Sequence, residues 1–402
     1  MVILNAYLLT LIIIAQQSSD TTGEKEKENL MKKKIVSALL CVAMIATMVT
    51  GCGGSKSSST SGNADSTAKQ FEINAAIAAN PPALDPHTVN ANVTGAIGIH
   101  IYEALFQMDE NYEPQPVLAE SYEMSDDGKE YTIKLRQGVK FHNGDEMKAD
   151  DVVASMNRWM ELSPKAKTLI GGSVFEKVDD YTVKLTVNEP SSDIIMVLAS
   201  PIQFAAIYPK SVVDSASDEG VKEYIGTGPY KVAEWKQDQY VKLEKNEDYQ
   251  PAEGKSSGLA GAKNAQADTI TFNIVTDTAT RIAGVQNGQY DIAEDIPADQ
   301  YKDLAADKNL TMDVRSGGTL NLFLNTTEGV MADEKVRQAA LAALNCDDIL
   351  MASYGDADLY KLNAGWCNPD DAQWGTEAGS EYYNQNDVEK AKKLLSESSY
   401  NN

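Results

Sequence analysis

The chain has 402 residues, a formal net charge of −24 and a sequence pI of about 4.5. Such an acidic surface argues against nucleic acid and an anionic lipid face as partners, and it is compatible with cationic or zwitterionic ligands. The length is sufficient for two lobes that each bury a core of their own.

Residues 1–30 fit poorly with the sequence that follows them. The apolar stretch 6–15 is too short for a membrane span, which needs about 20 residues. Residues 25–30 run directly into Met31, and their Lys-Glu pairs can be encoded as AAG-GAG, which reads like a ribosome-binding sequence. We therefore predict that translation starts at Met31 and that residues 1–30 are an over-extended reading of the gene.

Residues 31–51 have the parts of a secretory signal in the right order. Three lysines follow Met31, an apolar run comes next, and Val49-Thr50-Gly51-Cys52 closes it. A cysteine directly after small residues resembles the lipobox of bacterial lipoproteins, which implies cleavage before Cys52 and lipid on its thiol. The alternative is a secretion signal that merely contains a cysteine. Without residues 1–51, which hold five Lys and four acids, the net charge is −24 − (5 − 4) = −25.

The Ser/Gly-rich residues 52–69 are predicted to be a flexible tether between the membrane and a folded body. The body opens with an alternating strand at 71–77, which the prolines after Asn80 must end. An apolar helix is predicted over 93–106. Two strands, 119–124 and 131–136, flank the turn residues 125–128 as a hairpin, and a helix follows at 149–160.

Further elements alternate along the rest of the chain. The sequence predicts strands at 174–178, 181–187, 231–235, 240–245, 310–314 and 320–325, and helices at 192–200, 333–343, 347–353 and 388–396. The sequence also predicts a strand at 269–275, a helix at 278–286 that ends at Gly288, and a short strand at 290–293. A unit of this length implies a parallel strand pair in an α/β sheet.

Several stretches of the body, in this order and spacing, are similar to one family. They are Leu84-Asp85-Pro86, Tyr102-Glu103-Ala104-Leu105, Leu118-Ala119-Glu120-Ser121, residues 135–144 leading into Ala149-Asp150-Asp151-Val152, Gly226-Thr227-Gly228-Pro229-Tyr230 with Asn246 and Tyr249, Asn325-Thr326 with Val336-Arg337-Gln338-Ala339, and residues 389–395. Together they resemble the extracytoplasmic solute-binding proteins of peptide-type ABC importers, the family 5 of oligopeptide- and dipeptide-binding proteins.

The resemblance implies an α/β fold with mixed sheets, in which two lobes close on a ligand like a Venus flytrap. We expect residues 70–315 to form the first lobe with an inserted subdomain, and residues 316–402 to begin the second. Members of the family continue well past the point that corresponds to Asn402, so we expect the second lobe to be incomplete. The implied receptor is a monomer outside the cytoplasmic membrane that passes a peptide to an ABC permease with a cytoplasmic ATPase.

The resemblance also indicates residues that contact ligand. By position in the family, Asn80 and Pro81 face the cleft. A glycine-rich segment near the lobe crossing allows close backbone approach, and it comprises Gly317, Gly318, Thr319 and Asn321. Trp366 and Trp374 lie in an irregular segment where many relatives have a proline-rich loop, and they either wall the ligand pocket or pack in the second lobe.

No catalytic set or cofactor site is predicted. The three histidines, His87, His100 and His142, form no zinc-hydrolase pattern, and His142 is expected to be structural. The turn 226–230 lacks the Lys and Ser/Thr of a phosphate loop, so we expect a packing connector. Cys346 and Cys367 either form one disulfide or remain thiols.

Three other functions remain open at this point. The same scaffold could select another solute, such as an oligosaccharide or a nickel chelate. An incomplete chain could be a non-binding remnant or a surface adhesin. An enzyme is disfavoured because no positioned nucleophile or metal set is present in the sequence.

Overall fold

The computed structural model describes residues 70–217, 220–315, 318–365, 367 and 375–400. Every described residue belongs to one compact unit, residues 68–402. The proposed start at Met31, the signal, the tether and Cys52 all lie outside the described residues. Within the described ranges no helix is long and apolar enough to cross a membrane.

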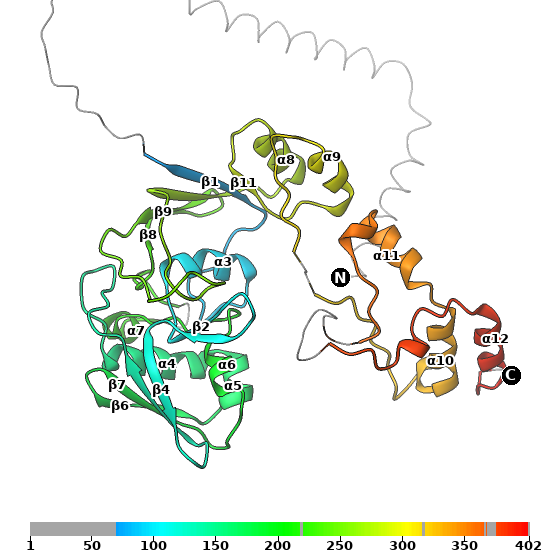
Figure 1. Cartoon of the computed structure of the whole chain (residues 1–402), viewed down its shortest axis with the longest axis horizontal. Helices are drawn as coiled ribbons and strands as arrows, with labels where there is room; N and C mark the ends of the chain where they lie inside the picture. The colour runs from blue at the N-terminus through cyan, green and yellow to red at the C-terminus, as the bar shows by residue number, and fades with distance from the viewer. Residues whose placement is uncertain (1–69, 218–219, 316–317, 366, 368–374, 401–402) are drawn as a thin grey trace, which may run out of the picture. The chain divides into compact units, whose positions relative to one another are not determined.

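Strand β1 (Glu72–Ile77) lies inside a five-stranded mixed sheet of order β11-β1-β10-β9-β8. The other strands are β8 (Tyr230–Lys236), β9 (Tyr240–Lys245), β10 (Thr269–Ile274) and β11 (Ile292–Ala293). β1 is parallel to β10 and to β11, whereas β9 is antiparallel to its neighbours β10 and β8. In Figure 1 the blue β1 accordingly lies among green and yellow strands from much later in the chain.

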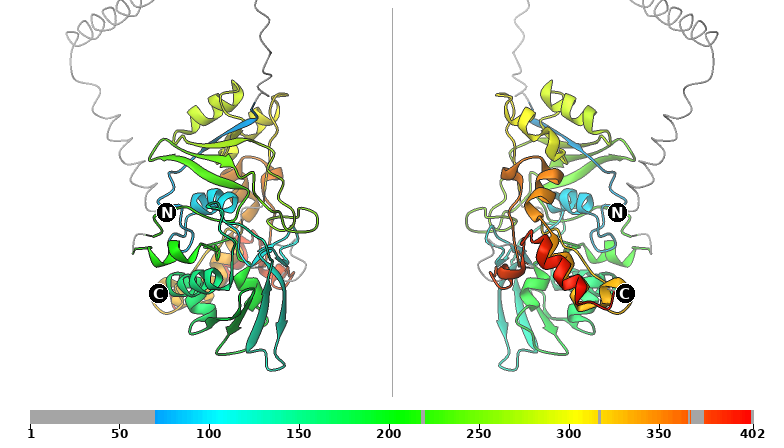
Figure 2. Two further views of the ribbon diagram at one scale, coloured as in Figure 1. Left: turned by 90° about the vertical axis from the view of Figure 1, so that its left-hand side faces the viewer. Right: turned by 90° about the vertical axis from the view of Figure 1, so that its right-hand side faces the viewer.

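One face of this sheet is covered by helix α3 (Asn92–Ile101), as Figure 2 shows. Their shared core contains Ala75, Ile77, Ile97, Ile101, Val241, Leu243, Ile270 and Phe272. Burying each large apolar side chain contributes about 1.5–3 kcal/mol, which explains why the alternating apolar positions of the strands decide which face points inward. The predicted strands at 71–77, 231–235, 240–245 and 269–275 are confirmed.

The predicted helix over 93–106 is wrong in its last turn. α3 ends at Ile101, because Tyr102 has extended backbone (φ −120°, ψ 157°) and its amide closes the helix on the Gly98 carbonyl. The carbonyl of Leu105 then accepts the amides of Val117 and Ala119 at 2.9 and 3.1 Å, and β2 (Phe106–Met108) pairs with β3 (Pro114–Pro116). An apolar run by itself does not distinguish buried helix from buried strand, and long-range pairing decided the matter.

A second, antiparallel sheet has four strands in the order β4-β5-β7-β6. They are β4 (Ala119–Met124), β5 (Glu130–Leu135), β6 (Val174–Asp179) and β7 (Thr182–Thr186). The predicted hairpin between β4 and β5 is confirmed, and Gly128 occupies the left-handed conformation (φ 69°) that its turn requires.

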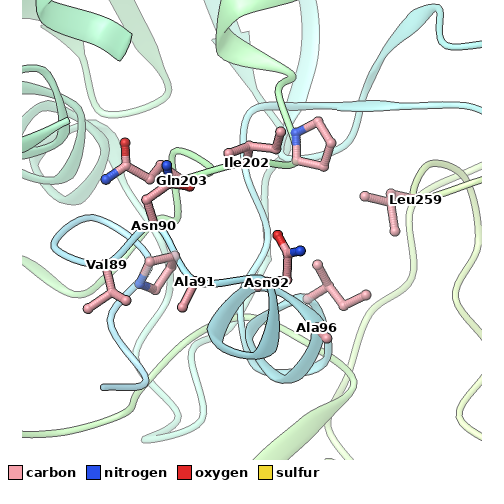
Figure 3. Close-up of a pocket in the computed structure, with 12 residues that line it drawn as sticks. Val89, Asn90, Ala91, Asn92, Ala96, Ile202, Gln203 and Leu259 are labelled. Carbon is pink, nitrogen blue, oxygen red and sulfur yellow. The ribbon is translucent and has the colours of Figure 1, made fainter. Parts of the chain in front are cut away.

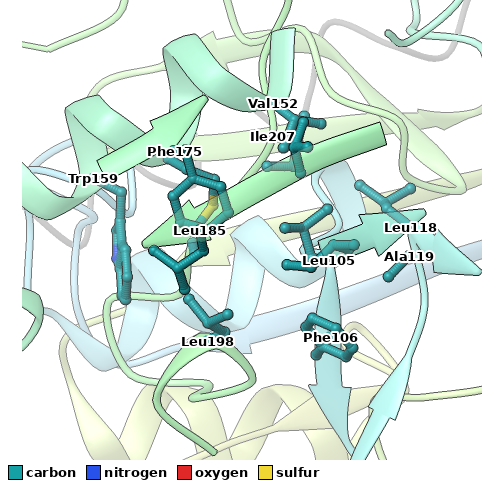
Figure 4. Packing of buried hydrophobic residues seen from close by; sticks show 14 of the residues in the cluster. Leu105, Phe106, Leu118, Ala119, Val152, Trp159, Phe175, Leu185, Leu198 and Ile207 are labelled. Carbon is teal, nitrogen blue, oxygen red and sulfur yellow. The ribbon is translucent and has the colours of Figure 1, made fainter. Parts of the chain in front are cut away.

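Four helices accompany this sheet: α4 (Ala149–Leu162), α5 (Pro164–Ile170), α6 (Ile194–Leu198) and α7 (Lys210–Asp214). Figure 4 shows Trp159 of α4 packed beside Phe175 and Leu185 of the sheet, with Leu198 of α6 below them. This core is separate from that of the five-stranded sheet. It is built entirely from residues that lie between β1 and β8 in the sequence.

A buried ionic network links the loop after β1 to helix α4. Asp85 is only 1% exposed and pairs with Arg158, whose Nη2 lies 2.6 Å from the Asp85 carboxylate. The Tyr208 hydroxyl and the Val221 amide also donate to this carboxylate, at 2.8 and 3.1 Å. Burial acts to raise the pKa of Asp85, but the hydrogen bonds and charge of Arg158 hold it below its usual value.

The predicted strand–helix–strand unit is β10, α8 (Thr278–Gln286) and β11. The two strands are parallel in direction, as predicted, but they do not pair with each other, because β1 lies between them. Gly288, just after the helix, has φ 77° as a residue that ends a helix often does. The order of strands was not readable from the local sequence.

The described residues between 298 and 400 form short helical elements and little core. The helical elements are η1 (Ala298–Gln300), α9 (Tyr301–Ala305), η2 (Val330–Ala332), α10 (Glu334–Ala343), α11 (Cys346–Tyr354), η3 (Ala357–Leu359), η4 (Ser380–Tyr382) and α12 (Val388–Ser396). The helices predicted at 333–343, 347–353 and 388–396 are confirmed, and α10 packs on α12 through Ala339, Ala342 and Ala391.

The strands predicted at 310–314 and 320–325 are wrong. Among the described residues neither segment joins a sheet, and Leu320 and Leu322 are 71% and 72% exposed. β-forming sequence becomes a strand only where a neighbouring strand supplies a ladder of hydrogen bonds. The lobe boundary at residue 316 stays a prediction.

Candidate functional site

Three parallel strands end together at one edge of the five-stranded sheet. β1, β10 and β11 run in the same direction, so the residues that follow them meet there. We call residues 78–81, 275–278 and 294–297 the carboxyl edge. In open α/β sheets ligands bind outside the carboxyl ends of the strands, which makes this edge the first candidate for a binding site.

Arg281 of α8 holds the carboxyl edge together from below and is only 2% exposed. Its guanidinium donates to the carbonyls of Val275 and Thr276, which follow β10, at 2.7 and 3.1 Å. It also donates to the carbonyls of Glu294 and Asp295, which follow β11, at 3.1 and 3.0 Å. One side chain therefore joins the ends of two strands that do not pair with each other.

The charged side chains exposed at the carboxyl edge are acidic: Asp277, Glu294 and Asp295. Glu294 accepts the Ala78 amide at 3.2 Å, and the partial burial of its carboxyl group raises the pKa of Glu294, although the residue as a whole is exposed. Asp277 caps α8, and hydrogen bonds from the Thr280 hydroxyl and amide hold its pKa below the usual value. The edge thus presents oxygen acceptors that suit N–H groups or a cationic group of a ligand.

Two of the predicted ligand contacts, Asn80 and Pro81, belong to the carboxyl edge. The Asn80 side chain is half-buried and accepts the amide of Asp238, from the turn between β8 and β9, at 3.4 Å. Pro81 is buried. Asn80 and Pro81 thus follow β1 at the same edge whose ends Arg281 and Glu294 contact at residues 275, 276, 294, 295 and 78, and the sequence did not single out Arg281 or Glu294.

The other predicted contacts belong to later parts of the chain. Gly318 has φ 119°, and Thr319 and Asn321 are exposed, with the Asn321 amide donating to the Thr319 hydroxyl at 2.9 Å. Gly317, Trp366 and Trp374 lie outside the described residues. For all of these residues, ligand contact stays a prediction.

A small pocket of about 240 Å³ lies at the amino end of α3. Figure 3 shows Val89, Asn90, Ala91 and Asn92 on one side of it and Ile202 and Gln203 on the other. Its lining is mainly apolar, with the Asn90, Asn92 and Gln203 side chains supplying amide groups. A lining of this kind suits one apolar side chain of a ligand with polar groups at its rim.

The histidines are engaged in packing and backbone hydrogen bonds. His142 donates from Nε2 to the Gly228 carbonyl at 3.0 Å and accepts the Gly226 amide on Nδ1 at 3.2 Å. His87 is bonded on both ring nitrogens as well, to Ala206 and Arg158. Among the described residues no three His, Cys, Asp or Glu side chains are grouped to hold a metal ion.

A signal for the carboxyl edge was present in the sequence, because the strand–helix–strand unit at 269–293 was recognisable. The rule that ligands bind at strand ends would have indicated residues 275–278 and 294–297. What was missing is the position of β1 between β10 and β11, which adds the residues after β1 to this edge. Nothing in the sequence indicated the pocket at the start of α3.

Comparison with known proteins gives a consistent result. Residues 113–402 match the family model described as bacterial extracellular solute-binding proteins, family 5 Middle. The chain is 33% identical over 340 residues to the glutathione-binding protein GsiB of Salmonella paratyphi A, which covers 82% of this chain and 62% of that protein. The chain therefore spans 62% of the length of this curated relative.

Two solved structures are similar over most of the chain. One is the binding protein AgaA of an Agrobacterium tumefaciens strain in complex with agropinic acid, with 27% identity, a TM-score of 0.64, and coverage of 81% of this chain and 64% of that one. The other is the periplasmic binding protein DppA of Helicobacter pylori in complex with peptide STSA, with 25% identity, a TM-score of 0.63, and coverage of 83% and 67%. The predicted α/β fold class of two-lobed periplasmic binding proteins, with mixed sheets, is confirmed.

Proposed function

This chain belongs to family 5 of the bacterial extracellular solute-binding proteins, and we propose from that premise that it is a solute receptor of an ABC importer that binds a short peptide. The family match over residues 113–402 is the observation that carries the proposal. The carboxyl edge and the pocket at the start of α3 provide the place where the ligand is bound on residues 70–315.

The chemistry of the carboxyl edge favours a peptide. A peptide backbone carries N–H donors and an α-ammonium group, and the edge offers carboxylates of Asp277, Glu294 and Asp295 as acceptors. The apolar pocket suits one side chain of such a ligand. Relatives named for glutathione and for a complex with peptide STSA support this class.

The second half of the proposed site comes from residues 316–402. We propose that they begin the second lobe and that Gly317, Gly318, Thr319, Asn321, Trp366 and Trp374 contact the ligand when the lobes close. Closure removes the ligand from water, so the closed form is the state that the ligand stabilises. The loaded receptor then passes its ligand to a membrane permease.

Anchoring by lipid on Cys52 completes the proposal. A tether of residues 52–69 keeps the receptor near its permease and raises its effective concentration there. Fatty-acid labelling of cells that express the full chain tests this, with Cys52→Ser as the matched control. Equal label in both proteins would refute the anchor while leaving the binding proposal intact.

The binding proposal is tested by calorimetry on the purified chain with four probes: reduced glutathione, the tetrapeptide Ser-Thr-Ser-Ala, agropinic acid and maltotriose. A ligand that binds only the folded state raises the free energy of unfolding by about 2.7 kcal/mol at 100 times its Kd. We expect binding and thermal stabilisation with a peptide probe. Binding of the sugar alone would replace peptide by oligosaccharide as the ligand class, and no response to any probe would favour the non-binding alternative.

Two variants locate the site. Glu294→Gln replaces the edge carboxylate, which accepts the Ala78 amide, by an uncharged amide group. We expect peptide binding to weaken by about tenfold, because the ligand loses a charge-assisted hydrogen bond to this side chain. Glu176→Gln, an exposed carboxylate on β6 of the other sheet, is the matched control and should leave the Kd within about twofold. Equal Kd values for both variants and the unmodified chain would place the ligand elsewhere.

A further inference from the structure

The guanidinium of Arg281 is engaged with the backbone and the Thr278 hydroxyl of the carboxyl edge. Its guanidinium donates five hydrogen bonds, four of them to the backbone carbonyls of Val275, Thr276, Glu294 and Asp295 and one to the Thr278 hydroxyl. All five acceptors belong to the carboxyl edge. None of them is a carboxylate, so the side chain acts as a clamp on the backbone.

The clamp coincides with an unfavourable backbone conformation. Asp295 has φ 53°, in the left-handed region that residues with a Cβ atom seldom occupy, although aspartate enters it more readily than most of them. Its carbonyl and that of Glu294 are both bonded to Arg281, at 3.0 and 3.1 Å. Residues held in such a conformation persist only where surrounding contacts over-determine them, and they are concentrated at ligand sites.

The backbone conformation at residues 294–295 also fixes the end of β1, the third strand at this edge. The Glu294 amide donates to the Ala76 carbonyl at 3.1 Å, and the Glu294 carboxylate accepts the Ala78 amide at 3.2 Å. Through Glu294, the Arg281 clamp therefore reaches the end of β1, where Asn80 and Pro81 follow. The ends of β10, β11 and β1 form one connected unit with a single buried guanidinium beneath it.

We propose that Arg281 is a positioning residue for ligand binding: it holds Asp295 in the left-handed conformation and so fixes the Glu294 side chain and the end of β1, which Glu294 contacts at Ala78, in the arrangement that binds the ligand. The inference rests on the proposed function, since it concerns the same edge. A pre-organised edge loses little conformational entropy when the ligand binds, so loss of the clamp weakens binding without removing any group that touches the ligand.

Lysine cannot replace this arginine. A guanidinium offers five N–H donors in a planar fork, and all four carbonyls and the hydroxyl are reached only from that fork. The lysine ammonium has three donors on one atom and cannot span the ends of two strands. Arg281→Lys thus keeps the charge and releases the clamp.

Arg136 provides a matched control. It also bonds backbone carbonyls with its guanidinium, those of Val117, Gln250 and Pro251 at 2.9, 3.1 and 2.9 Å. None of these three residues belongs to the carboxyl edge. Arg136→Lys therefore removes a carbonyl clamp of the same kind from a part of the fold that the proposal does not involve.

The first measurement is amide hydrogen exchange without ligand, on the full chain and both variants. In Arg281→Lys we expect the Ala78 and Glu294 amides to exchange at least about tenfold faster while amides of β5 and β7 keep their rates, because only the local clamp is lost. Arg136→Lys should not accelerate exchange at Ala78 or Glu294. Unchanged exchange at these two amides in Arg281→Lys would overturn the inference, whatever the ligand proves to be.

The second measurement is the Kd for reduced glutathione and for Ser-Thr-Ser-Ala. We expect Arg281→Lys to raise the Kd by about tenfold and Arg136→Lys by less than about twofold. A merely structural role of Arg281 predicts a lower free energy of unfolding with the Kd unchanged.

The outcomes separate this inference from the proposed function. Faster local exchange with an unchanged Kd would overturn the positioning role and leave the receptor proposal intact. If the unmodified chain binds neither probe, the peptide proposal fails and the positioning role fails with it, even where exchange shows that the clamp itself exists.

Discussion

Lowering the pH from 8 to 5 should destabilise the folded chain, because all three of its histidines are held neutral. Burial lowers the pKa of His87 to about 3, and burial lowers the pKa of His100 and of His142 to about 4. The His87 ring donates from Nε2 to the Ala206 carbonyl at 2.9 Å, and its Nδ1 accepts from Arg158 at 3.0 Å. No free lone pair is left on His87 to take a proton.

The sign and size of the effect follow from proton binding. Between pH 6.5 and about 4 the unfolded chain binds protons that the folded chain does not, so the free energy of unfolding falls as the pH falls. A pH of 5 lies about 1.5 units below the pKa of 6.5 of a free imidazole. At about 1.36 kcal/mol per unit, the free energy of unfolding therefore falls by about 2 kcal/mol for each histidine. His100 and His142 keep part of their surface in water, so we expect a total loss of about 4–6 kcal/mol.

Groups with raised pKa values act in the opposite direction. Burial raises the pKa of Asp151 and of Glu294, so the folded chain holds those protons more tightly and offsets a small part of the loss. Asp85, whose pKa is lowered, adds to the loss only below the pKa of a free carboxyl group. The window from pH 8 to pH 5 therefore reports chiefly on the histidines.

The assay is urea unfolding at each pH unit from 8 to 5, with proton uptake measured by calorimetry in buffers of different ionisation enthalpy. His100→Phe is the matched variant, because His100 packs against Tyr230 and Phe272 with ring centroids 6.0 and 5.7 Å away. We expect its loss between pH 8 and 5 to be smaller by about 2 kcal/mol. A free energy of unfolding that stays within about 1 kcal/mol across this range would refute the reasoning.

Two further substitutions test how the loop after β1 and the end of α3 are held. Arg158→Met leaves the buried carboxylate of Asp85 without its charge partner. Urea unfolding at pH 8 should show a free energy of unfolding lower by about 3–5 kcal/mol. A change below about 1 kcal/mol would contradict the assignment of this pair as buried. Gly226→Ala would place a Cβ atom 2.2 Å from the Ile101 carbonyl oxygen and 2.6 Å from the Tyr102 ring, which should cost about 1–3 kcal/mol or more by overpacking. Gly95→Ala in α3 meets only the Pro201 carbonyl at 3.9 Å, so the melting temperature of this control should not fall, and an equal fall in both would refute the packing explanation.

The sequence by itself determined the local elements wherever short-range chemistry decides them. The hairpin around Gly128, the helix α8 ended at Gly288, and the helices α10, α11 and α12 all follow from turn residues, caps and apolar spacing. The family resemblance and the α/β class with mixed sheets also came from the sequence, because they depend on the order of motifs along the chain.

The tertiary structure alone decided how those elements pair. It ended α3 at Ile101, left residues 310–314 and 320–325 outside the sheets of the described chain, and inserted β1 between β10 and β11. That insertion brings Asn80, Arg281 and Glu294 to one edge, although more than two hundred residues separate the first of them from the last. Strand order depends on which distant apolar faces bury each other best and on which backbone groups find partners, and neither is a property of a local stretch of sequence.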